Sequence, residues 1–169
     1  MVHEAHEQVL PAPRRRVRSA GWLLGAGLAG LMEGIVFHEI LGWHHFVQEA
    51  GARSDGLFHL ATWILAVAAI AMLWRARARF AEPGAGRVLT GSALVGAALL
   101  QLLDALVNHV LLRLHVLHPQ GEVLAWEIGW IAFTVALLLV GVRLLASATR
   151  LRGEAPARRP LTRRVRGTR

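Results

Sequence analysis

The sequence predicts an all-α fold, a four-helix transmembrane bundle built from two helical hairpins that repeat in parallel orientation. Two observations lead to this prediction: the chain is too apolar for an ordinary soluble domain, and one spacing of acid and histidine occurs twice. Of 169 residues, 54% are hydrophobic and 18% are charged, and the mean hydropathy is +0.43. These values are typical of a small integral membrane protein.

A membrane-spanning helix needs about 20 mostly apolar residues, and four windows meet this requirement. They cover about residues 20–43, 57–74, 88–114 and 123–146. We therefore expect a membrane domain at 20–147, between a basic cytoplasmic tail at 1–19 and an arginine-rich cytoplasmic tail at 148–169. The first window follows basic residues, as a signal peptide would, but its length and its acid–histidine pair indicate a mature span.

Arginine is concentrated in both tails and in the loop between the second and third windows, and it is sparse in the other two loops. Because basic residues favour the cytoplasmic side, both termini are expected in the cytoplasm of a bacterial inner membrane. The net charge of +8 then reflects topology and contact with the lipid bilayer, and no nucleic-acid partner is expected. The chain has no cysteine, which excludes disulfides and thiolate metal sites.

The repeated spacing is acid-x4-His-x5-His, and its two copies are 71 positions apart. The first copy is Glu33, His38 and His44, and the second is Asp104, His109 and His115. An ionisable side chain at the centre of a spanning helix costs about 2.5–3.5 kcal/mol, so such residues are usually functional. Two hairpins repeated in one orientation imply a pseudo-two-fold axis along the membrane normal.

Most of the histidines and several acids fall at the predicted outer ends of the spans. The candidate metal ligands are His38, His44, His45, Asp55, His59, His109, His115, His118 and Glu127. Glu33 and Asp104 are expected to lie behind them and to orient imidazoles or relay protons. In an α-helix His38 and His44 share a face only if the helix breaks near Gly42, so we expect the ligands of one ion to converge from several helices.

Imidazole and carboxylate without sulfur suit a metal ion, copper, iron or zinc, in a mononuclear or dinuclear site. Haem is less favoured, because axial ligation by His38 and His109 would leave most histidines unused. Without a cofactor, the same side chains would form hydrogen bonds between helices or a proton relay, and Asp55 would cap its helix. These alternatives stay open from the sequence.

At these residues the chain resembles a bacterial family of predicted four-span membrane proteins, domain of unknown function 2243. The resemblance covers about Gly21 to Ala146. Two departures are Ala105, where a glycine is expected after the acid, and Val116, which interrupts the second His-His pair. The resemblance implies the fold, the membrane location and partners in respiration or metal handling, and it carries over no substrate. The segments that carry it are Glu33-Gly-Ile-Val-Phe-His38, Leu41-Gly-Trp43-His44-His45, Asp55-Gly-Leu-Phe-His59, and Asp104 to His109 with His115.

Three functions follow from this reading. The first is a membrane metalloprotein that carries out or supports redox chemistry, which as an enzyme would be a metal-dependent oxidoreductase. The second is a protein that binds or transports metal ions and passes them to other proteins. The third is a proton-relay or assembly subunit of a respiratory complex without its own metal. The apolar inner halves of the spans favour a one-sided site over a transport path, and homo-oligomerisation stays open.

Overall fold

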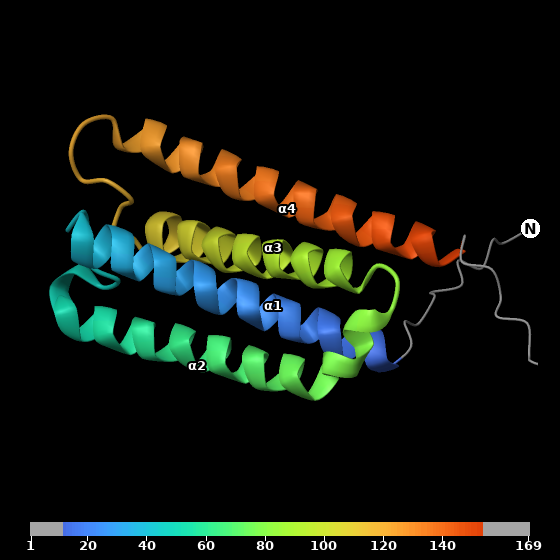
Figure 1. Ribbon diagram of the computed structural model, residues 1–169. Helices are drawn as coiled ribbons and strands as arrows, with labels where there is room; N and C mark the ends of the chain where they lie inside the picture. Colours follow the sequence, from blue (N-terminus) through green and yellow to red (C-terminus); the bar gives the residue numbers. More distant parts are fainter. Residues whose placement is uncertain (1–11, 154–169) are drawn as a thin grey trace, which may run out of the picture.

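The computed structural model describes residues 12–153, and all regular structure in that range is helical (Figure 1). This confirms the predicted all-α fold. The elements are α1 (Ala12–Glu33), η1 (Gly34–Ile40), η2 (Gln48–Ala50), α2 (Ala52–Ala76), η3 (Arg77–Ala81), α3 (Ala85–Leu103), η4 (Asp104–Leu111) and α4 (Val123–Gly153). The segments η1 and η4 are π-helical continuations of α1 and α3, whereas η2 and η3 are short 3-10 turns.

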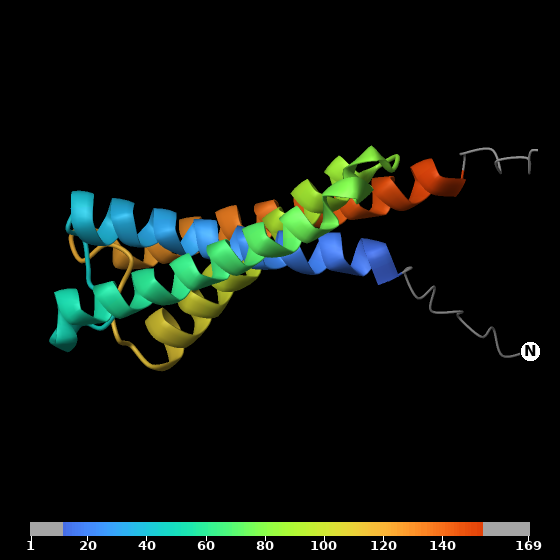
Figure 2. The same ribbon diagram turned by 60° about the horizontal axis from the view of Figure 1, so that its bottom comes forward.

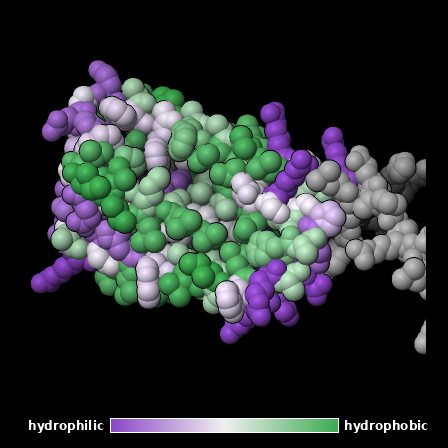
Figure 3. Space-filling view, viewed as in Figure 1, coloured by the Kyte–Doolittle hydropathy of each residue, from purple (hydrophilic) through white to green (hydrophobic). Residues whose placement is uncertain are grey.

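Four helical stretches are long and apolar enough to cross a membrane, which makes the chain a multi-pass membrane protein. Their mean hydropathies are 1.5, 2.0, 1.7 and 2.2. Large apolar side chains such as Leu57 and Trp74 lie on the surface, while Glu33, Asp55 and Thr134 are fully buried. On the face that Figure 3 shows, hydrophobic residues cover most of the middle and hydrophilic residues gather toward the two ends. The stretches are Arg14–Ile40, Ala52–Ala81, Ala85–Leu111 and Val123–Arg150.

The two central helices are α1 and α3; α2 packs against α1, and α4 packs against α3 (Figure 1). The start of α1 and the end of α4 lie at one end of the bundle, and η1 lies at the other end (Figures 1 and 2). Since η4 ends α3 as η1 ends α1, the arrangement gathers both histidine-containing segments at the end of the bundle opposite the termini.

Small residues bring the backbones of α1 and α3 into direct contact. A Cβ atom built on Gly25 would lie 1.8 Å from the carbonyl oxygen of Ala93, and one on Gly96 would lie 2.1 Å from that of Trp22. Gly25 and Gly96 are 71 positions apart, and so are Trp22 and Ala93. The same close contact is therefore made twice, as a two-fold axis between the halves requires.

The repeat continues into α2 and α4 with an offset of 72 positions, because the second hairpin carries one extra residue in the loop between its two helices. Thr62 and Thr134 are matched in this way, and each donates its hydroxyl proton to a backbone carbonyl of its own helix. Ala76 and Ala148 are also matched, and both lie in one buried cluster with Val17 and Val88. The two halves therefore share buried positions over their full length.

Both central helices end in the same backbone conformation. The Leu41 N–H donates to the Val36 carbonyl and the Leu112 N–H to the Val107 carbonyl, five residues back in each case. The next residues, Gly42 and Arg113, adopt left-handed φ values of 58° and 52°. The helical backbone therefore ends at Ile40 and Leu111, before the ends at 43 and 114 expected from hydropathy, because the left-handed residue turns the chain back across the bundle.

Candidate metal centre

The π-helical segments place the acid and the first histidine of each copy on one side of the helix. In an α-helix, residues five apart point about 140° away from each other. In a π turn, the hydrogen bonds join residues five apart, so these residues lie over one another. In the second copy, His109 Nε2 lies 2.9 Å from Asp104 Oδ2. The acid-x4-His spacing was thus a sequence signal for the π turn.

The left-handed residues then return the second histidine of each copy to the first. The ring centroids of His38 and His44 are 4.7 Å apart, and those of His109 and His115 are 4.4 Å apart. The helix does break at Gly42, which is the condition under which the sequence allowed His38 and His44 to share a face. Each group belongs to one continuous segment, whereas the sequence analysis expected the ligands of one ion to come from several helices; that expectation stays a prediction.

The result is two buried groups of three residues that could each hold a metal ion. In each group, one nitrogen or oxygen from every residue lies within 4.8 Å of the others. The groups adjoin, since the His44 and His115 rings stack with centroids 4.6 Å apart and an angle of 5° between their planes. We refer to the six residues together as the histidine cluster: Glu33, His38 and His44 in the first group, and Asp104, His109 and His115 in the second.

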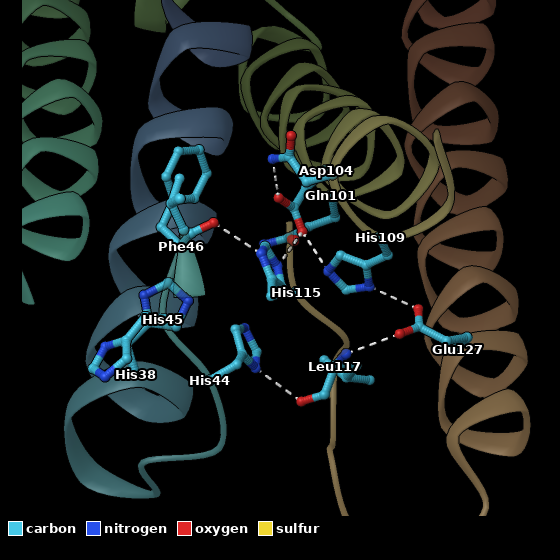
Figure 4. Close-up of polar contacts among 12 residues, drawn as sticks. His38, His44, His45, Phe46, Gln101, Asp104, His109, His115, Leu117 and Glu127 are labelled. Carbon is cyan, nitrogen blue, oxygen red and sulfur yellow. Dashed lines mark hydrogen bonds and ion pairs between the residues drawn. The ribbon is translucent and has the colours of Figure 1, made fainter. Parts of the chain in front are cut away.

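Each half of the chain orients an imidazole of the other half (Figure 4). His44 Nδ1 lies 2.8 Å from the Leu117 carbonyl oxygen, and His115 Nδ1 lies 2.9 Å from the Phe46 carbonyl oxygen. A carbonyl oxygen only accepts, so Nδ1 carries the proton in both rings and Nε2 keeps its lone pair. Nε2 of each ring is a nitrogen that can bind a metal, and both atoms are buried.

Carboxylates from the outer helices contact the other two imidazoles. Glu127 of α4 accepts a hydrogen bond from His109 Nδ1 at 2.7 Å and another from the Leu117 N–H at 2.8 Å. In the first half, Asp55 of α2 accepts the Phe46 N–H at 2.7 Å and lies 3.1 Å from His38 Nδ1. Asp55 and Glu127 thus perform matched roles 72 positions apart.

This geometry differs from the roles assigned from the sequence. Asp55 and Glu127, predicted as ligands, lie behind His38 and His109 and touch their far nitrogens. Glu33 and Asp104, predicted to lie behind the imidazoles, belong to the two candidate ligand groups. The sequence could not separate these roles, because the decisive backbone groups of residues 46 and 117 belong to loops.

Buried donor atoms without partners face the interior of the cluster. Within residues 14–150 no hydrogen bond reaches the Nε2 atoms of its four histidines, Glu33 Oε2 or Asp104 Oδ2, although buried polar atoms are normally paired. His109 Nε2 and Asp104 Oδ2 lie 2.9 Å apart without the geometry of a hydrogen bond. A cation between them would stabilise this contact.

His44 is held in the neutral form that binds metals. Burial lowers the pKa of His44 to about 3, and the neighbouring imidazoles of His115 and His38 lower it as well. A neutral imidazole offers a lone pair on the nitrogen that carries no proton. His44 is therefore available as a ligand at neutral pH without first losing a proton.

The family model described as a predicted membrane protein, DUF2243, matches residues 20–148. The chain belongs to this family. The match covers the whole histidine cluster and confirms the resemblance seen in the sequence. No curated protein matches the chain, and no solved structure does.

Three other histidines of this DUF2243 chain were predicted as ligands and lie outside both groups in the described structure. His45 is part-exposed and its Nδ1 donates to Asp55 Oδ2 at 2.6 Å. His59 lies near the cluster, with its ring centroid 6.3 Å from that of His38. His118 packs between Trp43 and Trp126, and its Nδ1 bonds to the backbone of residue 120. Metal ligation by these three stays a prediction.

The structure explains why Ala105 can stand where the family resemblance led us to expect a glycine. A Cβ atom on Gly34 would lie 2.0 Å from His59 Nε2, so glycine leaves room for this imidazole. At the matched positions of the second half, the DUF2243 chain has Ala105 in place of Gly34 and Ile131 in place of His59. The first half therefore carries one more imidazole than the second, together with the glycine that accommodates it.

Proposed function

We propose that this DUF2243 protein is a membrane metalloprotein that holds one metal ion in each group of the histidine cluster. The observation that carries the proposal is the set of buried nitrogen and oxygen atoms of the histidine cluster that have no hydrogen-bond partner among the described residues. Metal-binding histidines almost always donate their other N–H to a carboxylate or a backbone carbonyl. His44, His109 and His115 do so, which supports the proposal.

The donor set favours iron. Each group offers two imidazoles and one carboxylate, the set typical of non-haem iron(II) sites that keep open coordination positions. Copper and zinc accept the same donors and are the other outcomes of metal analysis. Bound iron would supply one-electron redox chemistry, and three protein ligands leave room for a small ligand. The chain itself holds the donors in place, orients the imidazoles and excludes water.

The packing of the imidazoles supports ions over haem. Neighbouring rings of the cluster lie 4.4–4.7 Å apart, measured between centroids. A haem with two axial histidines needs its flat macrocycle between their rings. Rings packed against one another in this way leave no such space among the described residues.

Two features support a resident, one-sided redox centre rather than a transport path. Below the cluster, the backbones of α1 and α3 touch at Gly25 and Gly96, which closes the central route through the bundle. The arginine distribution supports cytoplasmic termini in a bacterial inner membrane, so the cluster would lie near the outer face. A redox centre there would serve respiratory or metal-handling partners in the same membrane.

Elemental analysis by plasma mass spectrometry on the detergent-purified, full-length protein tests the proposal. We expect about two equivalents of iron or copper, lost in the His38→Ala, His109→Ala double variant. The single variant His44→Ala should keep about one equivalent. Glu49→Gln, which removes an exposed carboxylate at the same end of the bundle and outside both groups, is the matched control and should keep two.

The other outcomes are equally informative. One equivalent that disappears in every single-group variant would mean one ion shared by both groups. Well-folded protein that carries no metal after growth in metal-replete medium would overturn the proposal and favour the proton-relay or assembly function. Metal that exchanges within minutes and crosses proteoliposome membranes would favour transport.

A further inference from the structure

The two groups of the histidine cluster meet on the two-fold axis of the molecule. His44 and His115 are equivalent residues, 71 positions apart, and their rings stack with centroids 4.6 Å apart. Equivalent residues in direct contact lie on opposite sides of the axis that relates them, so this axis passes between the two rings. The distance across the axis is no longer than the 4.7 Å between the rings of His38 and His44 within the first group. The two groups therefore form one continuous site.

Imidazoles of both groups border the same buried interior. Nδ1 of His44 and of His115 is bound to the backbone of the opposite half, and Nε2 of each ring is buried without a hydrogen-bond partner among the described residues. The ring centroid of His44 lies 6.2 Å from that of His109, and the centroid of His38 lies 6.5 Å from that of His115. Both distances join one group to the other, so an ion held by one group would lie close to the ligands of the other.

The buried negative charge at the cluster matches two divalent ions. Four carboxylate residues lie in the cluster or against its imidazoles, and each is at most 9% exposed. In the part of the chain that the structure describes, the ion pairs of arginine are made with Glu82 and do not reach these four acids. Four ionised carboxylates balance two divalent cations, whereas buried charge without compensation is costly. The four acids are Glu33, Asp55, Asp104 and Glu127.

The two carboxylates inside the cluster differ in their surroundings. Asp104 Oδ1 accepts a hydrogen bond from the Asn108 amide at 2.7 Å, which leaves Oδ2 as the oxygen near His109. The position matched to Asn108 in the first half is Phe37, whose side chain offers no donor to Glu33. Glu33 Oε2 is buried without a partner within the described residues, and its carboxylate interacts electrostatically with Asp104 and His109. Glu33 is thus a member of the first group that also acts on the second.

We propose that the two ions form one dinuclear centre, in which the Glu33 carboxylate bridges both ions and Asp104 binds one of them through Oδ2. This inference rests on the proposed function, because it needs an ion in each group. Carboxylates bind metals through one or both oxygens, and the ions of two-metal sites in proteins lie about 3.5–4 Å apart. A dinuclear centre holds a small ligand between its two ions, which two separate sites cannot do.

Copper(II) bound to the detergent-purified, full-length protein tests the centre. X-ray absorption should show metal–metal scattering at about 3.5–4 Å. Bridged copper(II) spins couple, so the electron paramagnetic resonance signal at liquid-helium temperature should integrate to less than half of the copper counted by plasma mass spectrometry. Glu33→Gln keeps one metal-binding oxygen and loses the other, so its signal should rise to nearly the total copper. Glu49→Gln, which removes an exposed carboxylate outside both groups, is the control and should match the parent protein.

Two equivalents of copper without metal–metal scattering would reject the dinuclear centre and leave one separate ion in each group. A single equivalent would reject it as well. Glu33→Gln that still binds two equivalents with an unchanged signal would reject Glu33 as the bridge. If this variant binds less copper or melts at a lower temperature than the parent, the metal–metal distance in the parent protein decides. Protein that binds no metal would overturn the proposed function together with this inference, so the two failures are distinguishable.

Discussion

His44 in the first half of the chain donates its Nδ1 proton to the carbonyl oxygen of Leu117, 73 positions away in the second half, at 2.8 Å. The bond from His115 to Phe46 runs in the opposite direction. Each half therefore supplies the backbone group that orients an imidazole of the other. Neither hairpin can build its own candidate metal site without the second.

Replacing the carboxylates behind the imidazoles should weaken metal binding without unfolding the protein. Glu127→Gln removes the charge that accepts the His109 proton, and Asp55→Asn removes the charge that lies 3.1 Å from His38 Nδ1. Loss of such a partner typically reduces metal affinity about 10- to 100-fold. Competition with a chelator of known affinity measures the change. Glu82→Gln, at an exposed ion pair with Arg79, is the control, and unchanged affinity in the Glu127 variant would argue against an orienting role.

A methyl group at the centre of the bundle should destabilise the fold. In Gly25→Ala, the new Cβ would lie 1.8 Å from the backbone of Ala93, which cannot move aside as a flexible side chain would. Overpacking of this kind costs about 1–3 kcal/mol. Unfolding in mixed detergent micelles measures the free energy. Gly86→Ala, where no described atom lies within 4 Å of the new Cβ, should be neutral or stabilising, and equal stability of the two variants would contradict the close contact.

Substitutions at the two residues with left-handed φ, Arg113 and Gly42, should change the free energy of unfolding in opposite directions. Arg113 holds a φ of 52° that costs a residue with a side chain about 1–2 kcal/mol. Arg113→Gly removes this cost and adds about 0.4–1 kcal/mol of unfolded-state entropy, so a net gain of about 0.5–1 kcal/mol in the free energy of unfolding is expected. Gly42→Ala should lose a similar amount. Thermal unfolding of both variants provides the check, and two changes of the same sign would be inconsistent with the left-handed backbone.

Gly34 and His59 should behave as a coupled pair. Gly34→Ala places a methyl group on His59 Nε2 and should destabilise the outer end of α1. Combined with His59→Ile, which copies the second half, the same substitution should be tolerated. A double-mutant cycle is expected to give a coupling of about 0.5–3 kcal/mol, the range for residues in contact. Strictly additive effects would mean that the two residues do not compete for space.

Much of the fold could be predicted from the sequence because hydropathy decides it. Four apolar windows predicted four helices, and the 71-residue offset predicted two equivalent hairpins. The helix ends were less predictable, since an apolar window does not reveal a π turn or a left-handed residue. The equivalence of Gly42 and Arg113 was hidden because the residue types differ, although both adopt the same φ region.

The sequence predicted which residues belong to the candidate site better than it predicted how they are arranged. The six residues of the histidine cluster all came from the repeated spacing, because an ionisable group inside an apolar span is conspicuous. The roles of Asp55 and Glu127 depend on backbone N–H groups in the loops, which no side-chain pattern encodes.

A backbone carbonyl of each half accepts a hydrogen bond from an imidazole of the other half. This reciprocal pattern has a consequence for the origin of the chain. A duplicated gene for one hairpin accounts for the pattern, and before fusion two identical subunits would have met as a homodimer, each completing the other's site. In a homodimer every substitution appears twice. Fusion would remove that restriction, so one half could carry His59 with Gly34 while the other carries Ile131 with Ala105. The two halves have thus become specialised while the interface that joins them kept its original two-fold form.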